Sequence, residues 1–217
     1  MQIAIGLYPE FTALDAIGPY QVLTNLPGAE VVLCAARTGR LDDDNGLLHF
    51  DIEHTFADVD HPDVLLVPGG TITRKLAVDG DPTVEWIRAA HPHTTWTTSV
   101  CTGALLLGAA GVLQGLDATT HWSAYDHLRR FGANPLEQRV VIQGKVVTGA
   151  GVSAGIDLAL TLVAQLAGPE VAQAIQLGIE YDPQPPFDAG SPSKAPAPIY
   201  ELVTEVMKAE EAAVYAR

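Results

Sequence analysis

The stretch Thr94-Thr95-Trp96-Thr97-Thr98-Ser99-Val100-Cys101-Thr102-Gly103-Ala104-Leu105 decides the fold. Its first half is rich in β-branched and aromatic residues, which favour an extended chain. Its second half leads into a run of Ala and Leu up to Ala110, which favours a tightly packed helix. Cys101 is therefore expected on a sharp turn between a strand and a helix. The partial positive charge at the helix start predicts a thiolate near neutral pH.

Most free cysteines are simply small buried hydrophobic residues, and the same interpretation is open for Cys101. Three features favour a nucleophile instead. The residue follows a predicted strand, at the edge where open α/β sheets bind ligands. Its neighbours Thr102 and Gly103 are small and leave room for a substrate. A second site-like turn, Pro68-Gly69-Gly70, ends another predicted strand.

Strand and helix signals alternate along the chain, which predicts an α/β fold with a mostly parallel central sheet. Strands are expected at 3–7, 30–34, 64–67 and 94–100, and a hairpin at 139–142 and 145–148 turns at Gln143-Gly144. Helices are expected at 13–26, 82–90, 102–110, 123–131, 151–167, 169–180 and 199–216. Residues 181–198 hold six prolines, too many for regular structure. We expect one domain over residues 1–217.

Composition excludes several classes of function. The 217 residues are 47% hydrophobic and carry a formal net charge of −14 without a Lys/Arg cluster, which argues against nucleic-acid binding. No apolar run approaches the ~20 residues that cross a membrane. The chain enters a strand without a basic leader, and Cys34 and Cys101 cannot build a disulfide framework. A reducing cytoplasm fits best, with Cys34 as core packing.

Asp15 has two interpretations. Thr12 and Asp15 have the spacing of a helix capping box, and local sequence alone favours that role. Alternatively, the carboxyl group faces Cys101 across the carboxyl edge of the sheet. Burial beside a thiolate would favour its protonated form, because two adjacent anions repel each other. A protonated Asp15 could then donate a proton in the reaction.

Two further groups of residues have a catalytic and a structural interpretation. Gly69 and Gly70 can take positive φ and, with the N–H of Thr102, offer donors to charge developing on a substrate; an ordinary tight turn is equally consistent. The Thr102 hydroxyl is expected either to bind the thiolate or to cap its own helix. His121 is a candidate base, although a structural hydrogen-bond partner is the commoner role at such a boundary. The remaining histidines lack metal-ligand spacing, so we expect no metal.

The ordered set of segments resembles the ThiJ/PfpI superfamily and, within it, the isonitrile hydratases, over nearly the whole chain. It comprises Leu14 to Pro19, Val67 to Gly70, Ser99 to Ala104, Leu106 to Gly115, Ala118 to Trp122, Gly151 to Asp157 and the tail Glu180 to Pro192. The resemblance implies a flavodoxin-like three-layer sandwich with a cysteine nucleophile elbow, and a cofactor-free homodimer. One departure is Ala150, where similar sequences often have a third glycine; the extra methyl could stiffen the adjoining helix.

By the same resemblance, Cys101 is the nucleophile, Asp15 the acid/base partner and Thr102 a support for the cysteine. The implied reaction hydrates a small neutral isonitrile to an N-substituted formamide through a cysteine thioimidate. Gly70 and an apolar lining of Ile17, Trp122 and Val152 are expected to bind the substrate. Whether cysteine or water attacks first is left open, as is the identity of the isonitrile.

Other functions remain open at this stage. A protease or amidotransferase would carry a histidine directly after the nucleophile, where this chain has Thr102. A glyoxalase or deglycase usually has glutamate in place of Asp15. A ligand sensor fused to a DNA-reading region is not expected, because the chain has no basic segment. A redox sensor needs only an oxidisable Cys101. The segment 181–198 is expected to edge the pocket, to pack on a partner subunit or simply to connect two helices.

Overall fold

A seven-stranded sheet in the order β10-β11-β7-β6-β1-β2-β5 forms the centre of the computed structural model, which describes residues 1–216. Every neighbouring pair in this sheet is parallel except β10 and β11. The strands are β1 (Gln2–Gly6), β2 (Glu30–Ala35), β5 (His54–Thr55), β6 (Val64–Val67), β7 (Trp96–Ser99), β10 (Val140–Gln143) and β11 (Val146–Gly149).

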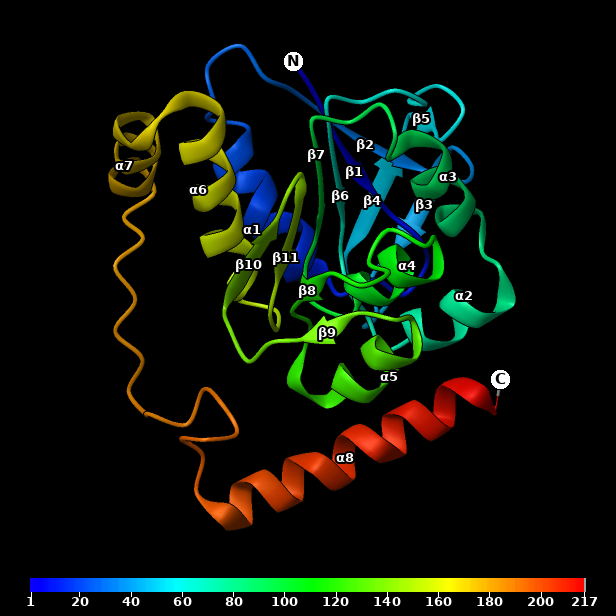
Figure 1. Ribbon diagram of the computed structural model, residues 1–217, viewed down its shortest axis with the longest axis vertical. Coiled ribbons are helices and arrows are strands. Elements are labelled where there is room, and N and C mark those ends of the chain that lie inside the picture. The colour runs from blue at the N-terminus through cyan, green and yellow to red at the C-terminus, as the bar shows by residue number, and fades with distance from the viewer. Residues whose placement is uncertain (217) are drawn as a thin grey trace.

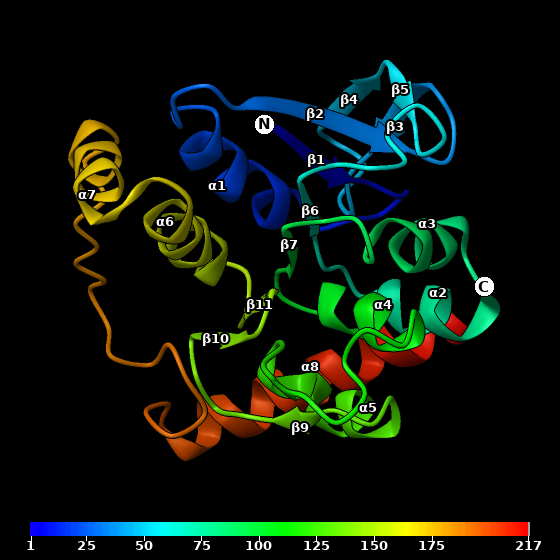
Figure 2. The same cartoon turned by 45° about the horizontal axis from the view of Figure 1, so that its top comes forward.

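Helices cover both faces of this sheet, so the predicted three-layer α/β sandwich is confirmed (Figure 2). One layer holds α1 (Ala13–Leu23), α6 (Ala154–Ala167) and α7 (Pro169–Gly178). The other holds α2 (Thr73–Asp79), α3 (Pro82–Ala90), α4 (Gly103–Ala109) and α5 (Tyr125–Arg130). All four side chains of β6 are buried, as expected of a strand covered on both sides.

Several elements were not expected from the sequence. Residues between the second and third predicted strands form a small antiparallel sheet of β3 (Gly39–Asp42) and β4 (His49–Ile52). A second small sheet pairs β8 (Asp117–Ala118) with β9 (Asn134–Pro135). The helix predicted at 123–131 is divided into a 3-10 turn, η1 (Trp122–Ala124), and α5. Helix α2 was missed altogether.

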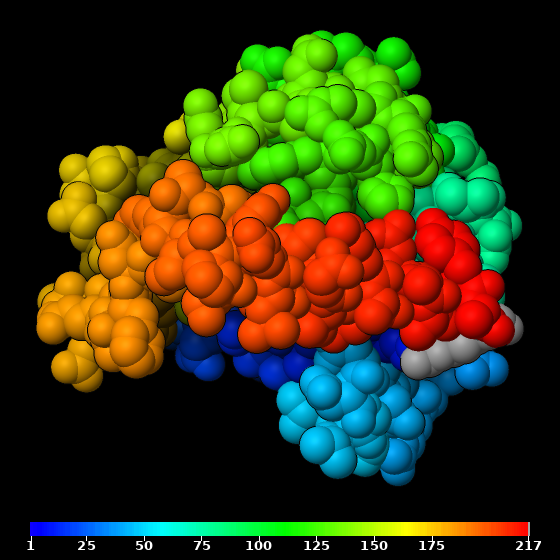
Figure 3. All heavy atoms as spheres, turned by 90° about the horizontal axis from the view of Figure 1, so that it is seen from below, coloured from blue at the N-terminus to red at the C-terminus, as the bar shows by residue number. Residues whose placement is uncertain are grey.

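After α7 the chain runs without regular structure along one side of the molecule and ends in α8 (Ala197–Tyr215), which crosses the underside (Figures 1 and 3). Glu211 of α8 pairs with buried Arg74 of α2 at 3.3 Å and with His127 of α5 at 3.0 Å. Tyr200, near the start of the same helix, packs its ring on Trp122. The tail is thus fixed to the domain at both ends of α8.

The sheet topology brings the ends of β1, β6 and β7 together. These three strands are neighbours in parallel register, so the residues that follow them emerge at one edge. Tyr8 follows β1, the Pro68-Gly69-Gly70 turn follows β6, and Cys101 follows β7. Helix α1, which carries Asp15, begins at the same edge. Among the helices of residues 1–216, none is both long enough and apolar enough to cross a bilayer.

Candidate active site

Cys101 occupies the predicted elbow between β7 and α4. Its φ of 85° lies in the left-handed region, where a non-glycine residue is strained. Hydrogen bonds hold it there: its N–H donates to the Gly149 carbonyl at 3.1 Å, and its carbonyl accepts from the Thr120 hydroxyl at 2.6 Å. A Cβ at Gly103 would collide with the carbonyls of Val67 and Pro68, so the helix can start this close to β6 only with glycine.

Asp15 lies beside Cys101, fully buried on α1. Its Oδ2 accepts a hydrogen bond from the Gly69 N–H at 2.8 Å. Its Oδ1 is also buried and has no nitrogen or oxygen partner among residues 1–216. The capping interpretation is wrong, because Thr12 makes no side-chain cap and its hydroxyl donates to Asp44 instead. Local spacing favoured the cap, but the contact with Gly69, far away in sequence, determines where the carboxyl group lies.

Burial controls the charges of this pair. It raises the pKa of Asp15 from 3.8 to about 7, although the Gly69 N–H and the Cys101 thiol lower it. Burial, followed by the nearby Asp15 charge, raises the pKa of Cys101 well above its ordinary value. The N–H groups of Val152 and Thr102 face the sulfur and lower that pKa, but not enough to compensate. The prediction that the helix start alone keeps Cys101 as a thiolate near neutral pH is therefore wrong.

The two groups can share a proton, because each is hydrogen-bonded to the other. Once the first proton leaves near pH 7, one proton remains for the carboxyl and the thiol together. That proton can reside on sulfur, giving thiol and carboxylate, or on Asp15, giving thiolate and carboxylic acid. The second tautomer contains both a nucleophile and a proton donor. Chemically, the arrangement can therefore add sulfur and hydrogen to the same small electrophile.

Thr102 and the two glycines are locked to one another. The Thr102 hydroxyl donates to the Gly70 carbonyl at 2.9 Å and accepts from the Gly70 N–H at 3.0 Å. It therefore neither caps α4 nor binds the sulfur, contrary to both expectations. The N–H groups of Gly69 and Gly70 serve Asp15 and Thr102, so they are not free to hold charge on a substrate. Neither glycine has positive φ in the described chain; both are needed because a Cβ would collide with neighbouring atoms.

His121 is a poor base. Its Nδ1 accepts from the Ser123 N–H at 3.3 Å and lies 2.9 Å from the Ser123 hydroxyl. Burial and the charge of Arg74 lower its pKa to about 4, so the ring is neutral at pH 7. A Cβ on Gly151 would lie 2.8 Å from the ring, which places His121 against the turn before α6. The geometry favours the structural role.

The predicted pocket residues do not gather around Cys101 as a group. Val152 faces the sulfur through its N–H. Trp122 packs between His121 and Tyr200. Ile17 lies on the outer face of α1, in an apolar groove of about 300 Å³ that it shares with Tyr20 and other side chains.

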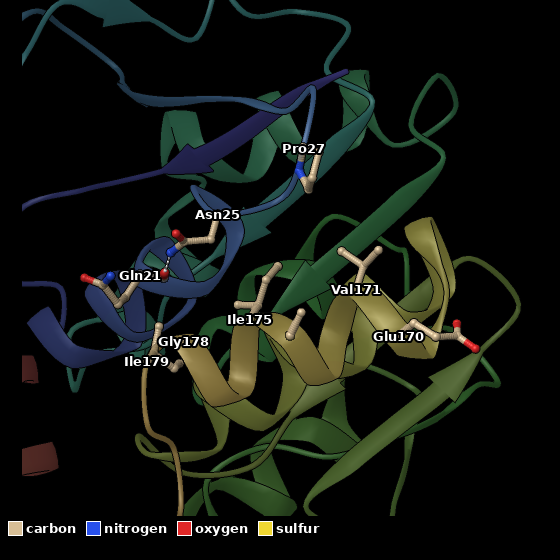
Figure 4. A pocket seen from close by; sticks show the side chains of 9 residues that line it. Gln21, Asn25, Pro27, Glu170, Val171, Ile175, Gly178 and Ile179 are labelled. Atoms are coloured by element: carbon tan, nitrogen blue, oxygen red, sulfur yellow. Dashed lines mark hydrogen bonds between the residues drawn. The ribbon is translucent and has the colours of Figure 1, made fainter.

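A larger cavity of about 530 Å³ lies between the end of α1 and α7 (Figure 4). Its lining includes Gln21, Asn25 and Ile175, and the Asn25 amide donates to the Gln21 carbonyl at 2.7 Å. None of the predicted site residues lines this cavity. Cys101 itself is 5% exposed and lines neither this cavity nor the groove at Ile17.

Tyr8 is a site residue that the sequence analysis missed. Its hydroxyl donates to the Pro68 carbonyl at 2.6 Å, which holds the turn that supplies Gly69 to Asp15. Burial, then the charges of Asp15 and Cys101, raises its pKa well above 10. It follows β1 directly, so a search for polar residues after each strand would have found it.

Two other predictions concern cysteine and metals. Cys34 is buried in β2, and burial raises the pKa of its thiol to about 12, which confirms the core-packing interpretation. Within residues 1–216, no three His, Cys, Asp or Glu side chains are grouped as a metal ion would require.

Known proteins resemble this chain in both sequence and structure. The sequence model of the DJ-1/PfpI family matches residues 1–165. The isonitrile hydratase of Pseudomonas putida is 44% identical over 201 residues, covering 93% of this chain and 87% of that protein. The crystal structure of a ThiJ/PfpI family protein from Pseudomonas syringae, 41% identical, superposes with a TM-score of 0.89 over 98% of this chain and 90% of that one.

A transcriptional regulator of Pseudomonas aeruginosa, CdhR, is 35% identical, but over only 41% of this chain and 27% of that protein. The resemblance to the hydratase, in contrast, includes the segment after α7. Fold, strained elbow and sequence similarity agree, and the chain belongs to the DJ-1/PfpI family.

Proposed function

We propose that the protein is an isonitrile hydratase that converts R–N≡C and water into an N-substituted formamide. The observation that carries this proposal is the buried Oδ1 of Asp15, which has no nitrogen or oxygen partner in residues 1–216 and lies beside the Cys101 thiol. A buried carboxyl oxygen without a nitrogen or oxygen partner can hold a proton for a substrate. The 44% identity to the Pseudomonas putida hydratase supports the same choice of reaction.

The reaction begins from the tautomer with a thiolate on Cys101 and a proton on Asp15. The sulfur adds to the terminal carbon of the isonitrile, and Asp15 protonates that carbon, leaving the thioimidate R–N=CH–S–Cys. The oxygen of a water molecule then adds to the thioimidate carbon while the Asp15 carboxylate takes a proton from that water. Asp15 passes this proton to the nitrogen. Collapse returns the hydroxyl proton to Asp15, expels the thiolate and releases R–NH–CHO. Water is the only net reactant besides the isonitrile.

The direct test mixes purified protein with a simple alkyl isonitrile and follows formamide production. Turnover is expected from the wild type and none from Cys101→Ala. If the wild type consumes methylglyoxal and not the isonitrile, the glyoxalase alternative replaces this proposal. If neither is consumed, a sensor role remains, although the raised pKa and 5% exposure of Cys101 disfavour rapid oxidation.

We also propose that two copies associate through the outer face of α1. Leu14, Ile17 and Tyr20 are spaced along one side of that helix and are 45%, 36% and 43% exposed. They adjoin the apolar groove that Ile17 helps to line. Apolar faces of this kind are characteristic of contacts between subunits. Sedimentation of the wild type and of Tyr20→Glu tests this: a dimer that the substitution dissociates is expected, and a wild-type monomer would refute it.

A further inference from the structure

The turn that precedes α6 is tied to the sulfur. Residues 150–153 carry the Val152 N–H, which faces Cys101. The Ala150 N–H donates to the Arg139 carbonyl at 2.9 Å, so the turn is attached to the segment before β10. Ala150 is not among the positive-φ residues of the described chain, so alanine fits there without backbone strain. The orientation of one donor to the nucleophile therefore depends on how firmly this short turn is held.

Arg139 grips the same turn with its side chain. Its Nη2 donates to the Ser153 hydroxyl at 3.2 Å, at the last residue of the turn. Its Nε and Nη2 both reach Oδ2 of Asp157, at 2.7 Å and 2.6 Å. Asp157 lies in the first turn of α6, where a carboxylate also interacts favourably with the helix dipole. One guanidinium thus binds the turn and the helix start together.

Tyr181 completes the cluster from a distant segment. Its hydroxyl donates to the same Oδ2 of Asp157 at 2.9 Å. It belongs to the stretch after α7 that runs down the side of the molecule (Figure 1), outside the 1–165 range matched by the family. Neither the core of the fold nor the proposed chemistry accounts for this contact. The Arg139 and Asp157 side chains are 50% and 32% exposed, so solvent weakens the ion pair, and the Tyr181 hydroxyl is a further bond that holds Asp157.

We propose that Arg139, Asp157 and Tyr181 are positioning residues, which fix the 150–153 turn so that the Val152 N–H stays directed at the Cys101 sulfur. None of the three touches the sulfur itself. They act through the turn. The Arg139 carbonyl holds one end by accepting from the Ala150 N–H, and the Arg139 guanidinium holds the other by donating to Ser153. Tyr181 adds to the family domain a contact that limits rotation of Asp157. This inference rests on the proposed role of Cys101 as the nucleophile.

The test measures how the reactivity of the Cys101 sulfur depends on pH, as well as turnover. Rates of Cys101 alkylation by iodoacetamide are recorded against pH, with kcat and KM for an isonitrile, for wild type, Tyr181→Phe and Asp157→Asn. A donor that is less well directed stabilises the thiolate less, so the alkylation midpoint should move up by about 0.5 pH unit. We expect kcat to fall about threefold in Tyr181→Phe and about tenfold in Asp157→Asn, with KM changed less than about twofold.

Matched variants separate positioning from general stability. Lys194→Gln removes an exposed ion pair with Asp188 in the same segment and should change neither the midpoint nor kcat. Arg139→Lys should recover part of the activity lost in Arg139→Gln, because an ammonium still reaches one partner.

Tyr181→Phe retains the ring and changes only a hydroxyl, so it should fold. An alkylation midpoint equal to the wild type in Tyr181→Phe and Asp157→Asn would overturn the inference, even if their melting temperatures fell. If the wild type hydrates no isonitrile, the proposed function fails, but the alkylation midpoints still decide whether the turn is positioned by these residues.

Discussion

Replacing Asp15 with asparagine should abolish turnover while removing a loss of stability that the folded wild type suffers as pH rises. Asparagine has nearly the same shape, and its carbonyl can still accept the Gly69 N–H bond. The amide carries no acidic proton that it could transfer to a substrate, and it cannot ionise. The substitution therefore separates the chemical role of the carboxyl group from its structural role.

The magnitude follows from the pKa of Asp15. Its carboxyl ionises at 3.8 in an exposed chain and at about 7 when folded. Between these values the folded state holds more protons than the unfolded state, so the free energy of unfolding falls as pH rises. At ~1.4 kcal/mol per pH unit, the wild type loses up to about 4 kcal/mol across the interval. The asparagine variant lacks this loss.

The assay is denaturant unfolding of both proteins at about pH 4.5 and about pH 8.5. The stability of Asp15→Asn relative to the wild type should increase between the two conditions by about 3 kcal/mol, because the loss between pH 3.8 and about 4.5 lies outside the measured range. Any fixed cost of placing an amide there cancels in this difference. Repeating the pair in a Cys101→Ala background removes the coupled thiol titration. If both proteins show the same dependence on pH, Asp15 does not ionise near neutrality in the fold, and the shared-proton argument fails.

Three other predictions follow from the same site. In the wild type, kcat/KM should rise as pH increases through about 7, where the first proton leaves the pair, and fall at high pH when the last one leaves; a profile flat from acid to alkali would contradict this. Gly69→Ala would place a Cβ 2.7 Å from Asp15 Oδ2. We expect activity to fall at least about tenfold and the free energy of unfolding, measured in denaturant, to fall by about 1–3 kcal/mol. Gly178→Ala, with open space around the added methyl, should be neutral. Thr102→Val breaks both bonds to Gly70 and should cost about 1–3 kcal/mol of stability by the same measurement, while Thr102→Ser should restore most of it.

Much of the fold was predictable because its strongest signals are local. The four apolar residues of β6 could form only a buried strand, and Pro82 after Asp81 marks the start of α3, where the Asp81 side chain caps the helix. The β3–β4 hairpin gave no such signal. Phe50 and Ile52 alternate with exposed His49 and Asp51 in β4, but each strand is only four residues long, too short for periodicity to identify it.

The site was only partly predictable, because its decisive contacts join residues far apart in sequence. The spacing of Thr12 and Asp15 predicted a capping role for Asp15, whereas in the structure its carboxylate accepts a hydrogen bond from Gly69. Position at a strand end identified Cys101 as an elbow residue, and its φ of 85° confirms that placement. The direction of its pKa depends on burial and on Asp15, which no local pattern reveals. The same limit explains why Tyr8 was missed.

The way the site uses its N–H groups favours an adduct without full negative charge on oxygen. Acyl transfer needs free donors for a tetrahedral oxyanion. Here the Gly69 and Gly70 N–H groups are occupied by Asp15 and Thr102, whereas the Val152 and Thr102 N–H groups face the sulfur. The donors thus support the nucleophile and the acid. In the hydration we propose, the thioimidate would be neutral, because the proton from Asp15 would arrive with the sulfur. A site that protonates the reacting carbon directly has no need of a separate oxyanion hole.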